Sequence, residues 1–158
     1  MRQILYALQF LGRATAERHR PGVLVTTAFA PSCRVTTTIG PDGVAGAVEP
    51  VAGERATCEA AVGVDAAGRA WGAATVTFGA AGHRLHLRLL GHTGLDGGAP
   101  ARSSLVWEVE RGEGQFAGAA GLIASHLVVG DAGEVVDTQI GVIALASPRG
   151  RRGPGGAA

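Results

Sequence analysis

Hydrophobic and polar residues alternate along most of this chain. In the segment SSLVWEVER, Leu105, Trp107 and Val109 occupy alternate positions, with Glu108 and Glu110 in the other set. Successive side chains of a β-strand point to opposite faces, so this pattern predicts a strand with an apolar inner face and a wetter outer face. The segment GHRLHLRLLG repeats the pattern, with leucines at 85, 87 and 89 and polar residues at 84, 86 and 88.

Runs of this kind recur, and clusters of turn-forming residues separate them. The predicted strands cover residues 3–16, 22–39, 43–50, 54–65, 69–79, 82–91, 103–111, 114–130 and 133–146. The separators include RPG, GPDG, AG at 52–53, DAAG, RGEG and GDAG. Short loops of this kind join antiparallel neighbours. A sustained helical period is missing, although the alanine content leaves room for one short helix at 12–20.

Regularly spaced strands predict an all-β sandwich or barrel. We favour a closed antiparallel β-barrel of about eight strands, because closure at this chain length removes exposed sheet edges. We expect residues 1–146 to form this single barrel domain. Residues 147–158 are rich in Arg, Gly and Pro and have no apolar period, so we expect them to form a disordered tail.

The segment GEGQFAGAAG, residues 112–121, concentrates glycine around Phe116. It matches neither a dinucleotide fingerprint nor a phosphate-binding loop, because Ala117 stands three positions after Gly114 and the chain contains no lysine. Glycine within a strand marks a bend, a bulge or a close approach of two backbones. We therefore interpret Gly118 and Gly121 as residues that let the strand kink while Phe116 turns inward to fill one end of the barrel.

The pattern G-x-G-x-F-x-G-A-x-G, the apolar strand after it and the sequence GEVVDTQIGVIAL together resemble the C-terminal half of allene oxide cyclase-like and dirigent-like β-barrels. The resemblance covers about residues 104–146 and implies a calycin-like barrel. Bacterial relatives of that barrel class include spirotetronate-type cyclases, which fold a flexible polyketide inside the barrel for a 4+2 cycloaddition. The preceding part of the chain carries no motif of these families, so no catalytic residue is transferred from them.

Large apolar residues on the predicted inward faces form a candidate ligand site inside the barrel. They are Tyr6, Phe10, Phe78, Leu87, Trp107 and Phe116. Such a lining suits an elongated apolar ligand, and the abundant alanine and glycine would leave space for it. The same side chains would alternatively fill a solid core, as an eight-stranded barrel permits. In that case Trp107 plugs the barrel instead of contacting a ligand.

Metal and hydrolase chemistry find little support in the sequence. His83 and His86 stand at i and i+3, which places them on opposite faces of a strand, so they would not share a metal ion. No Gly-x-Ser-x-Gly elbow occurs. We predict neither a metal nor a cofactor, and the sequence singles out no catalytic residue.

Three functions fit these features. A cyclase or isomerase without cofactor would hold a small, largely apolar, polyketide-like metabolite in a reactive conformation and lower the entropic part of the barrier. A non-catalytic carrier or sensor would use the same cavity. A purely structural oligomer would fit a solid core.

The net charge of +1 predicts no nucleic-acid partner, because binding to phosphates needs a clustered positive field. No apolar run approaches the roughly 20 residues that span a bilayer, so we expect no membrane partner. Both faces of the last predicted strand, 133–146, are largely apolar. This predicts cover on both sides of that strand, for which a homodimer is the simplest source.

The N-terminal sequence MRQILYALQFLGRATA has features of a signal peptide and of a first strand. Because Gln9 interrupts a short apolar run, we favour the strand and a cytoplasmic protein. The two cysteines, Cys33 and Cys58, allow either one disulfide or two reduced thiols. We favour reduced thiols, since a buried free cysteine is common in protein cores.

Overall fold

The computed structural model describes residues 2–20, 22–65, 67, 69–94 and 101–146, so the predicted tail at 147–158 lies outside the described residues. The strands are β1 (Arg2–Ala16), β2 (Val23–Gly40), β3 (Gly43–Val64), β4 (Ala70–Phe78), β5 (His83–Thr93), β6 (Ala101–Glu113), β7 (Ala120–Val129) and β8 (Glu134–Leu145). A single 3₁₀ turn, η1 (Gly114–Phe116), lies between β6 and β7.

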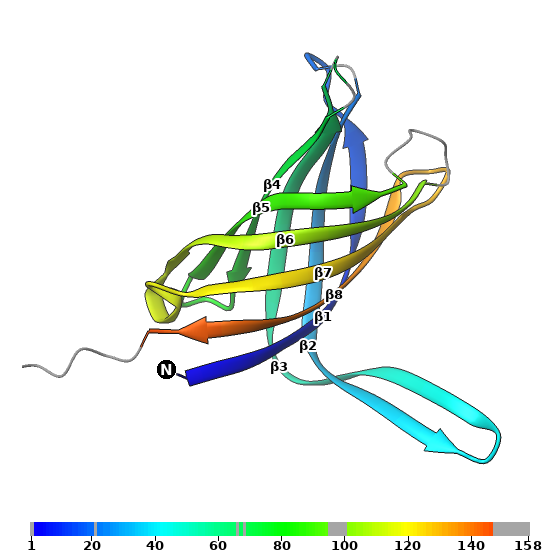
Figure 1. Cartoon of the computed structure of the whole chain (residues 1–158), viewed down its shortest axis with the longest axis vertical. Coiled ribbons are helices and arrows are strands. Elements are labelled where there is room, and N and C mark those ends of the chain that lie inside the picture. Colours follow the sequence, from blue (N-terminus) through cyan, green and yellow to red (C-terminus); the bar gives the residue numbers. More distant parts are fainter. Residues whose placement is uncertain (1, 21, 66, 68, 95–100, 147–158) are drawn as a thin grey trace, which may run out of the picture.

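The strands form one β-barrel-like ring (Figure 1). Each strand pairs antiparallel with the next one in the chain, and β8 pairs back with β1 from Arg2–Leu145 to Arg13–Glu134. Short turns produce this order, because they can join only neighbouring antiparallel strands. The prediction of an all-β chain with about eight antiparallel strands is confirmed.

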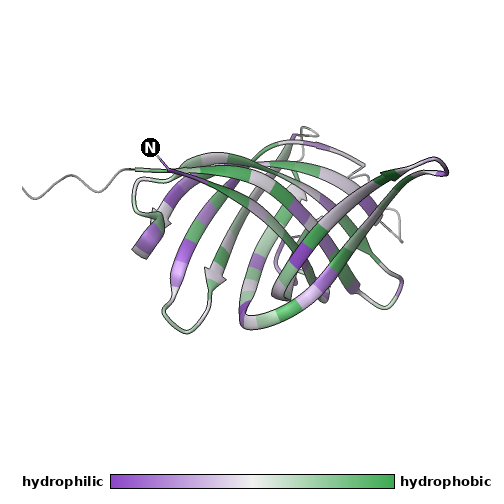
Figure 2. Cartoon of the chain, turned by 90° about the horizontal axis from the view of Figure 1, so that it is seen from below, coloured by the Kyte–Doolittle hydropathy of each residue, from purple (hydrophilic) through white to green (hydrophobic). Residues whose placement is uncertain are grey.

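Apolar residues fill the inside of the ring, as the alternation predicts. Leu105, Trp107 and Val109 of β6 are buried, and so are the leucines at 85, 87 and 89 of β5. The residues between them are exposed or half-buried. Figure 2 shows this alternation as bands of hydrophobic and hydrophilic residues along the strands. Burial of each large apolar side chain contributes roughly 1.5–3 kcal/mol, so the core stabilises the ring.

The structure contradicts one predicted turn. Residues 43–64 form the single strand β3, where the sequence predicted two strands with a turn at 52–53. The register between β2 and β3 shifts between Pro31 and Cys33, and the extra residues of β3 make an irregularity at this point. The prediction of a turn at 52–53 was wrong because Ala-Gly also suits a bulge in a long strand.

Beyond this irregularity, β2 and β3 continue as a two-stranded arm, residues 33–50, that extends from the ring (Figure 1). β1 pairs with β2 only from Leu11–Phe29 to Ala16–Leu24. β4 pairs with β3 no further toward the arm than Ala56. The strands of the arm therefore pair with each other and with no other described strand.

The glycine-rich segment after β6 bends, as predicted. Gly118 has a φ of +71°, in the left-handed region that residues with a Cβ rarely adopt. At Gly121 a Cβ atom would overlap the carbonyl oxygen of Val142 on the neighbouring strand. Because η1 and the bend precede Ala120, where β7 begins, the prediction of one strand from 114 to 130 was wrong at its start.

The short helix considered for residues 12–20 is also wrong. β1 continues to Ala16, and a turn follows it. Among the described residues, no helix has the length and apolar character needed to cross a membrane.

Candidate functional site

A cavity of about 520 Å³ lies at the end of the ring where β1 begins and the arm departs. Its wall is mainly apolar and includes Tyr6, Phe78 and Phe116. The exposed side chains of Arg55 and Gln115 lie at its rim. Small-molecule sites are typically clefts of roughly 300–1,000 Å³ with apolar walls and a few polar groups. This cavity is therefore the candidate functional site.

The cavity lies where the ring is least completely paired. Residues 2–10 of β1 pair with β8, but among the described residues they have no register with β2, because β2 leaves the ring after Pro31. Residues from both faces of β1, including Tyr6 and Leu5, line the cavity, which places it beside this strand as well as under it. Cys33 of β2 still contacts β1 here, since its thiol donates a hydrogen bond to the carbonyl oxygen of Ala7 at 3.3 Å.

Three aromatic rings pack together in the wall of the cavity. Tyr6 and Phe78 meet edge to face with their centroids 6.2 Å apart, and the centroids of Phe78 and Phe116 are 5.0 Å apart. Pairs of this kind contribute roughly 0.5–1.5 kcal/mol beyond the burial of their area. Phe116 belongs to η1, so the bend in the glycine-rich segment turns this ring inward, as predicted, and sets it against the cavity.

A row of hydrogen bonds runs into the core from Tyr6, and we call its members, Tyr6, Gln139, Asp137 and Ser125, the buried polar chain. The Tyr6 hydroxyl donates to Gln139 Oε1 at 2.6 Å, and Gln139 Nε2 donates to Asp137 Oδ2 at 2.6 Å. The Ser125 hydroxyl donates to Asp137 Oδ1. Asp137 and Gln139 share the inner face of β8, and Ser125 is the register partner of Gln139 on β7.

Burial has the largest effect on the pKa values of the buried polar chain. It raises the pKa of the Tyr6 hydroxyl well above the ordinary value of 10.0, so this side chain is neutral near neutral pH. Burial also raises the pKa of the Asp137 carboxyl, although the hydrogen bonds from Ser125 and Gln139 act to lower it. Tyr6 thus offers the cavity a neutral ring, and its proton is directed to Gln139.

Cys58 lies beside the buried polar chain and is buried with it. Its sulfur lies 3.9 Å from Gln139 Nε2, and burial raises the pKa of the thiol to about 12. Both Cys58 and Cys33 are free thiols in the structure, in agreement with the reduced state that we favoured from the sequence.

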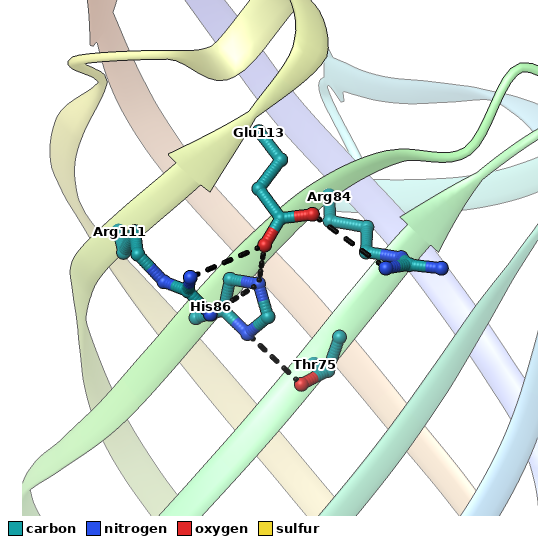
Figure 3. Close-up of polar contacts among 5 residues, drawn as sticks. All are labelled: Thr75, Arg84, His86, Arg111 and Glu113. Atoms are coloured by element: carbon teal, nitrogen blue, oxygen red, sulfur yellow. Dashed lines mark hydrogen bonds and ion pairs between the residues drawn. The ribbon is translucent and has the colours of Figure 1, made fainter.

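A second polar group lies on the outside of β4, β5 and β6, and Figure 3 shows its members, which we call the outer cluster: Thr75, Arg84, His86, Arg111 and Glu113. The Nε2 atom of His86 lies 3.0 Å from Glu113 Oε1, and its Nδ1 lies 3.2 Å from Thr75 Oγ1. Arg111 and Arg84 reach the Glu113 carboxylate at 3.3 and 3.5 Å. The hydrogen bond with His86 and the two arginines lower the pKa of Glu113.

The order Thr75–His86–Glu113 resembles the hydroxyl, imidazole and carboxylate of a hydrolytic triad. Such chemistry also needs preorganised donors for the oxyanion. Thr75 lies on β4, which pairs with β3 on one side and β5 on the other, so the neighbouring backbone N–H groups serve the sheet. We therefore interpret the outer cluster as a surface network of ion pairs and hydrogen bonds.

The structure divides the six side chains predicted to line a ligand site. Tyr6, Phe78 and Phe116 line the cavity. The other three, Phe10, Leu87 and Trp107, lie in the buried core and are not among the lining residues. The indole Nε1 of Trp107 is buried and has no hydrogen-bond partner within the described part of the chain. Contact of any of the six with a ligand stays a prediction.

The two histidines of HRLH lie on opposite sides of the sheet, as strand alternation predicts. His83 lines the cavity and accepts a hydrogen bond from the backbone N–H of Gln115 at 3.3 Å. His86 belongs to the outer cluster.

Sequence reasoning missed Ser125, Asp137 and Gln139 as members of a site. The available signal was the position of Asp137 and Gln139 on the same face of the last strand. Because both faces of residues 133–146 are rich in apolar residues, alternation alone does not say which face is the inner one.

No family model matches this chain, and neither a curated protein nor a solved structure matches it. Its function is therefore argued from the cavity and the side chains around it.

Proposed function

We propose that the chain is a closed, calycin-like barrel of the allene oxide cyclase-like and dirigent-like kind. We further propose that it acts on a small, largely apolar, polyketide-like metabolite as a cyclase or isomerase without metal or cofactor. The observation that carries this proposal is the cavity of about 520 Å³ beside Tyr6, Phe78 and Phe116. The pairing of β8 with β1 and the inward turn of Phe116 support the barrel class.

The proposed mechanism is mainly conformational. A rigid apolar cavity holds a flexible chain with its reacting atoms close together, which lowers the entropic part of the barrier. This suits a 4+2 cycloaddition, because such a reaction moves no proton and needs no ionised catalytic group. Arg55 and Gln115 at the rim carry N–H donors that can hold a carbonyl group of the substrate.

The buried polar chain has a supporting role in this mechanism. Its bond from Tyr6 to Gln139 fixes the orientation of the Tyr6 ring in the cavity wall. Packing and hydrogen bonds of this kind are what keep a binding surface within the tolerance that catalysis needs.

A non-catalytic carrier or sensor is the second candidate, and one observation favours it. Tyr6 is neutral, and its proton is already directed to Gln139. Glu54 and Arg55, the charged side chains among the described lining residues, are exposed at the rim. Such a cavity can bind an apolar ligand without a proton leaving Tyr6.

Binding is tested with the fluorescent apolar dye ANS. Ala56 lines the cavity and is buried, so the larger side chain of Ala56→Leu would occupy part of the cavity. Thr27 is exposed on the outer face of β2, and Thr27→Leu is the matched control. We expect Ala56→Leu to weaken dye binding about tenfold or more, since its three added carbon atoms crowd the site that the dye would fill. Equal affinity in both variants, with unchanged circular dichroism, would contradict binding in this cavity.

Catalysis is tested with a linear polyene that carries a tethered electron-poor alkene. A cycloaddition or isomerisation leaves the molecular mass unchanged and shifts the chromatographic retention time. We expect wild-type protein to produce this shift and Ala56→Leu to reduce its rate. Dye binding without any conversion, across a series of chain lengths, supports the carrier instead.

We propose that Trp107 contacts the part of a bound ligand that extends from the cavity into the core. Its buried Nε1 has no hydrogen-bond partner among the described residues and could donate to a carbonyl group of a ligand that reaches the core. A Trp71→Phe background makes the fluorescence report on Trp107 alone. We expect a non-fluorescent fatty acid to change that signal. An unchanged signal at saturating ligand would show that Trp107 is part of the core only.

A further inference from the structure

The arm, residues 33–50, has an apolar face and a polar face. Directly paired residues of antiparallel strands point to the same side, so the pairs Val35–Val48 and Ile39–Val44 share one face. Ile39 is 82 % exposed and Val44 is 73 % exposed. The opposite face carries the polar residues Arg34, Thr36, Thr38 and Glu49.

A ribbon with this pattern needs cover on its apolar face. An isolated two-stranded hairpin is marginally stable in water, because it buries too little apolar area to offset the entropy of ordering its chain. Hydrophobic residues, green in Figure 2, continue to the end of the arm. Within the described residues, the arm strands pair only with each other.

The same chain carries a second uncovered apolar surface on the outside of β1, β7 and β8. Leu5, Val142 and Leu122 form one row across the three strands, and Ile140 lies in the next row between Ala7 and Ala124. The four large residues of this surface, which we call the outer apolar wall, are 48–76 % exposed: Leu5, Leu122, Ile140 and Val142. These two rows contain no charged residue.

The arm does not cover this wall in its own chain. In both Figure 1 and Figure 2 the arm extends away from the end of the ring at which β1 begins. We propose that two copies of the chain exchange arms, so that the apolar face of each arm packs on the outer apolar wall of the other copy. This proposal does not rest on the proposed catalytic function, although the outer apolar wall shares Leu5 and Ala7 with the lining of the cavity.

The size of the contact suits a dimer. At about 3.3 Å per residue, the paired stretch from Cys33 to Gly40 is about 25 Å long, and a two-stranded ribbon is about 10 Å wide, so one arm covers about 250 Å². Two reciprocal contacts, counted on both surfaces, bury about 1,000 Å², which reaches the lower range of specific interfaces.

Charge favours a second copy over a lipid surface. Recognition of an anionic membrane uses clusters of basic residues beside the apolar surface. Arg34 is the one basic residue of the arm, and Asp42 and Glu49 outweigh it. The uncharged wall of a second copy fits the uncharged face of the arm, and each copy supplies one of each.

The test measures the mass of the full chain in solution by sedimentation velocity over a wide range of concentration. We expect wild-type protein to dimerise. Val44→Glu on the arm and Val142→Lys on the wall each disturb both contacts of a dimer, so each is expected to raise the dissociation constant more than about tenfold. Thr38→Glu, on the polar face of the arm, is the matched control and keeps the dimer.

Mixing the two interface variants separates a broken interface from a misfolded chain. A dimer of one Val44→Glu chain and one Val142→Lys chain keeps one native contact and concentrates both changes in the other. We expect the mixture to dimerise although neither variant does so alone. A monomeric wild type, a dimer that survives both substitutions, or a mixture that stays monomeric would each overturn the exchange of arms.

Discussion

The buried polar chain and the outer cluster use similar side chains in opposite surroundings. Asp137 accepts hydrogen bonds inside the ring, whereas Glu113 accepts them on its outer surface. Burial raises the pKa of Asp137, and the hydrogen bond with His86 lowers the pKa of Glu113. The difference follows from solvation, because a carboxylate without water depends entirely on its protein partners.

This comparison distinguishes polar groups that contribute strongly to the folding stability from polar groups that contribute little. Each member of the buried polar chain is unable to replace a lost partner with water, so removal of one leaves another unsatisfied. Each member of the outer cluster has solvent beside it. Exposed ion pairs of this kind contribute little to stability. The resemblance of Thr75–His86–Glu113 to a catalytic triad is therefore weaker evidence of function than the cavity beside Tyr6.

The largest expected difference concerns thiol reactivity. Burial raises the pKa of Cys58 to about 12 from the ordinary 9.0, which lowers its thiolate fraction about a thousandfold. Cys33 is only half-buried. We expect iodoacetamide near neutral pH to label Cys33 first and Cys58 only on unfolding, as read by peptide mass spectrometry. Equal labelling rates in native protein would mean that Cys58 is not in a closed core.

Removal of the Asp137 carboxylate is expected to have the next largest effect. Asp137→Ala leaves the donors of Gln139 and Ser125 buried without an acceptor, and we expect a loss of about 3 kcal/mol in the free energy of unfolding. Urea denaturation measures it. Asp137→Asn retains part of the bonding and should lose less. If Asp137→Ala were as stable as Glu113→Ala, the two regions would not differ as proposed.

One bend connects the two regions, because the chain passes from Glu113 on the outside to Phe116 on the inside. Gly118 within this bend has a φ of +71°, so Gly118→Val is expected to lose about 1–3 kcal/mol. Ala117 has a φ of −54°, which valine adopts without strain, and Ala117→Val is the matched control. Thermal unfolding measures both. The same midpoint for the two variants would show that the backbone conformation at 118 is not required.

The smallest expected effect is a difference in the sign of the pH dependence. The raised pKa of Asp137 means that its contribution is full below the ordinary 3.8 and is lost as pH rises through the folded value. The lowered pKa of Glu113 means that its contribution is present above the ordinary 4.5 and is lost as pH falls through the folded value.

Unfolding midpoints across this acidic range check the signs. Relative to Asp137→Asn, wild-type protein should lose stability as pH rises. Relative to Glu113→Gln, it should gain a little, because solvent screens the exposed carboxylate. Slopes of the same sign would contradict the difference in burial.

The sequence by itself determined the strands and most of their inner faces. In β5 and β6 one set of alternate positions is apolar and the other is polar, so only one orientation buries the leucines at 85, 87 and 89 and Trp107. The glycines at 118 and 121 predicted a bend, and the structure has it at Gly118, where φ is positive. Gly121 lies instead within β7, where the close approach of the neighbouring backbone requires glycine.

Only the tertiary structure decided the position of the site. The cavity exists because β2 pairs with residues 11–16 of β1 and leaves residues 2–10 without a neighbour on the β2 side. This register between β1 and β2 depends on how all the strands of the ring pair. The inward position of Asp137 depends on which of two apolar faces of β8 meets the core. The arm exists because residues 52–53 form an irregularity instead of a turn. In each case the local sequence permits two outcomes, and long-range strand pairing selects one of them.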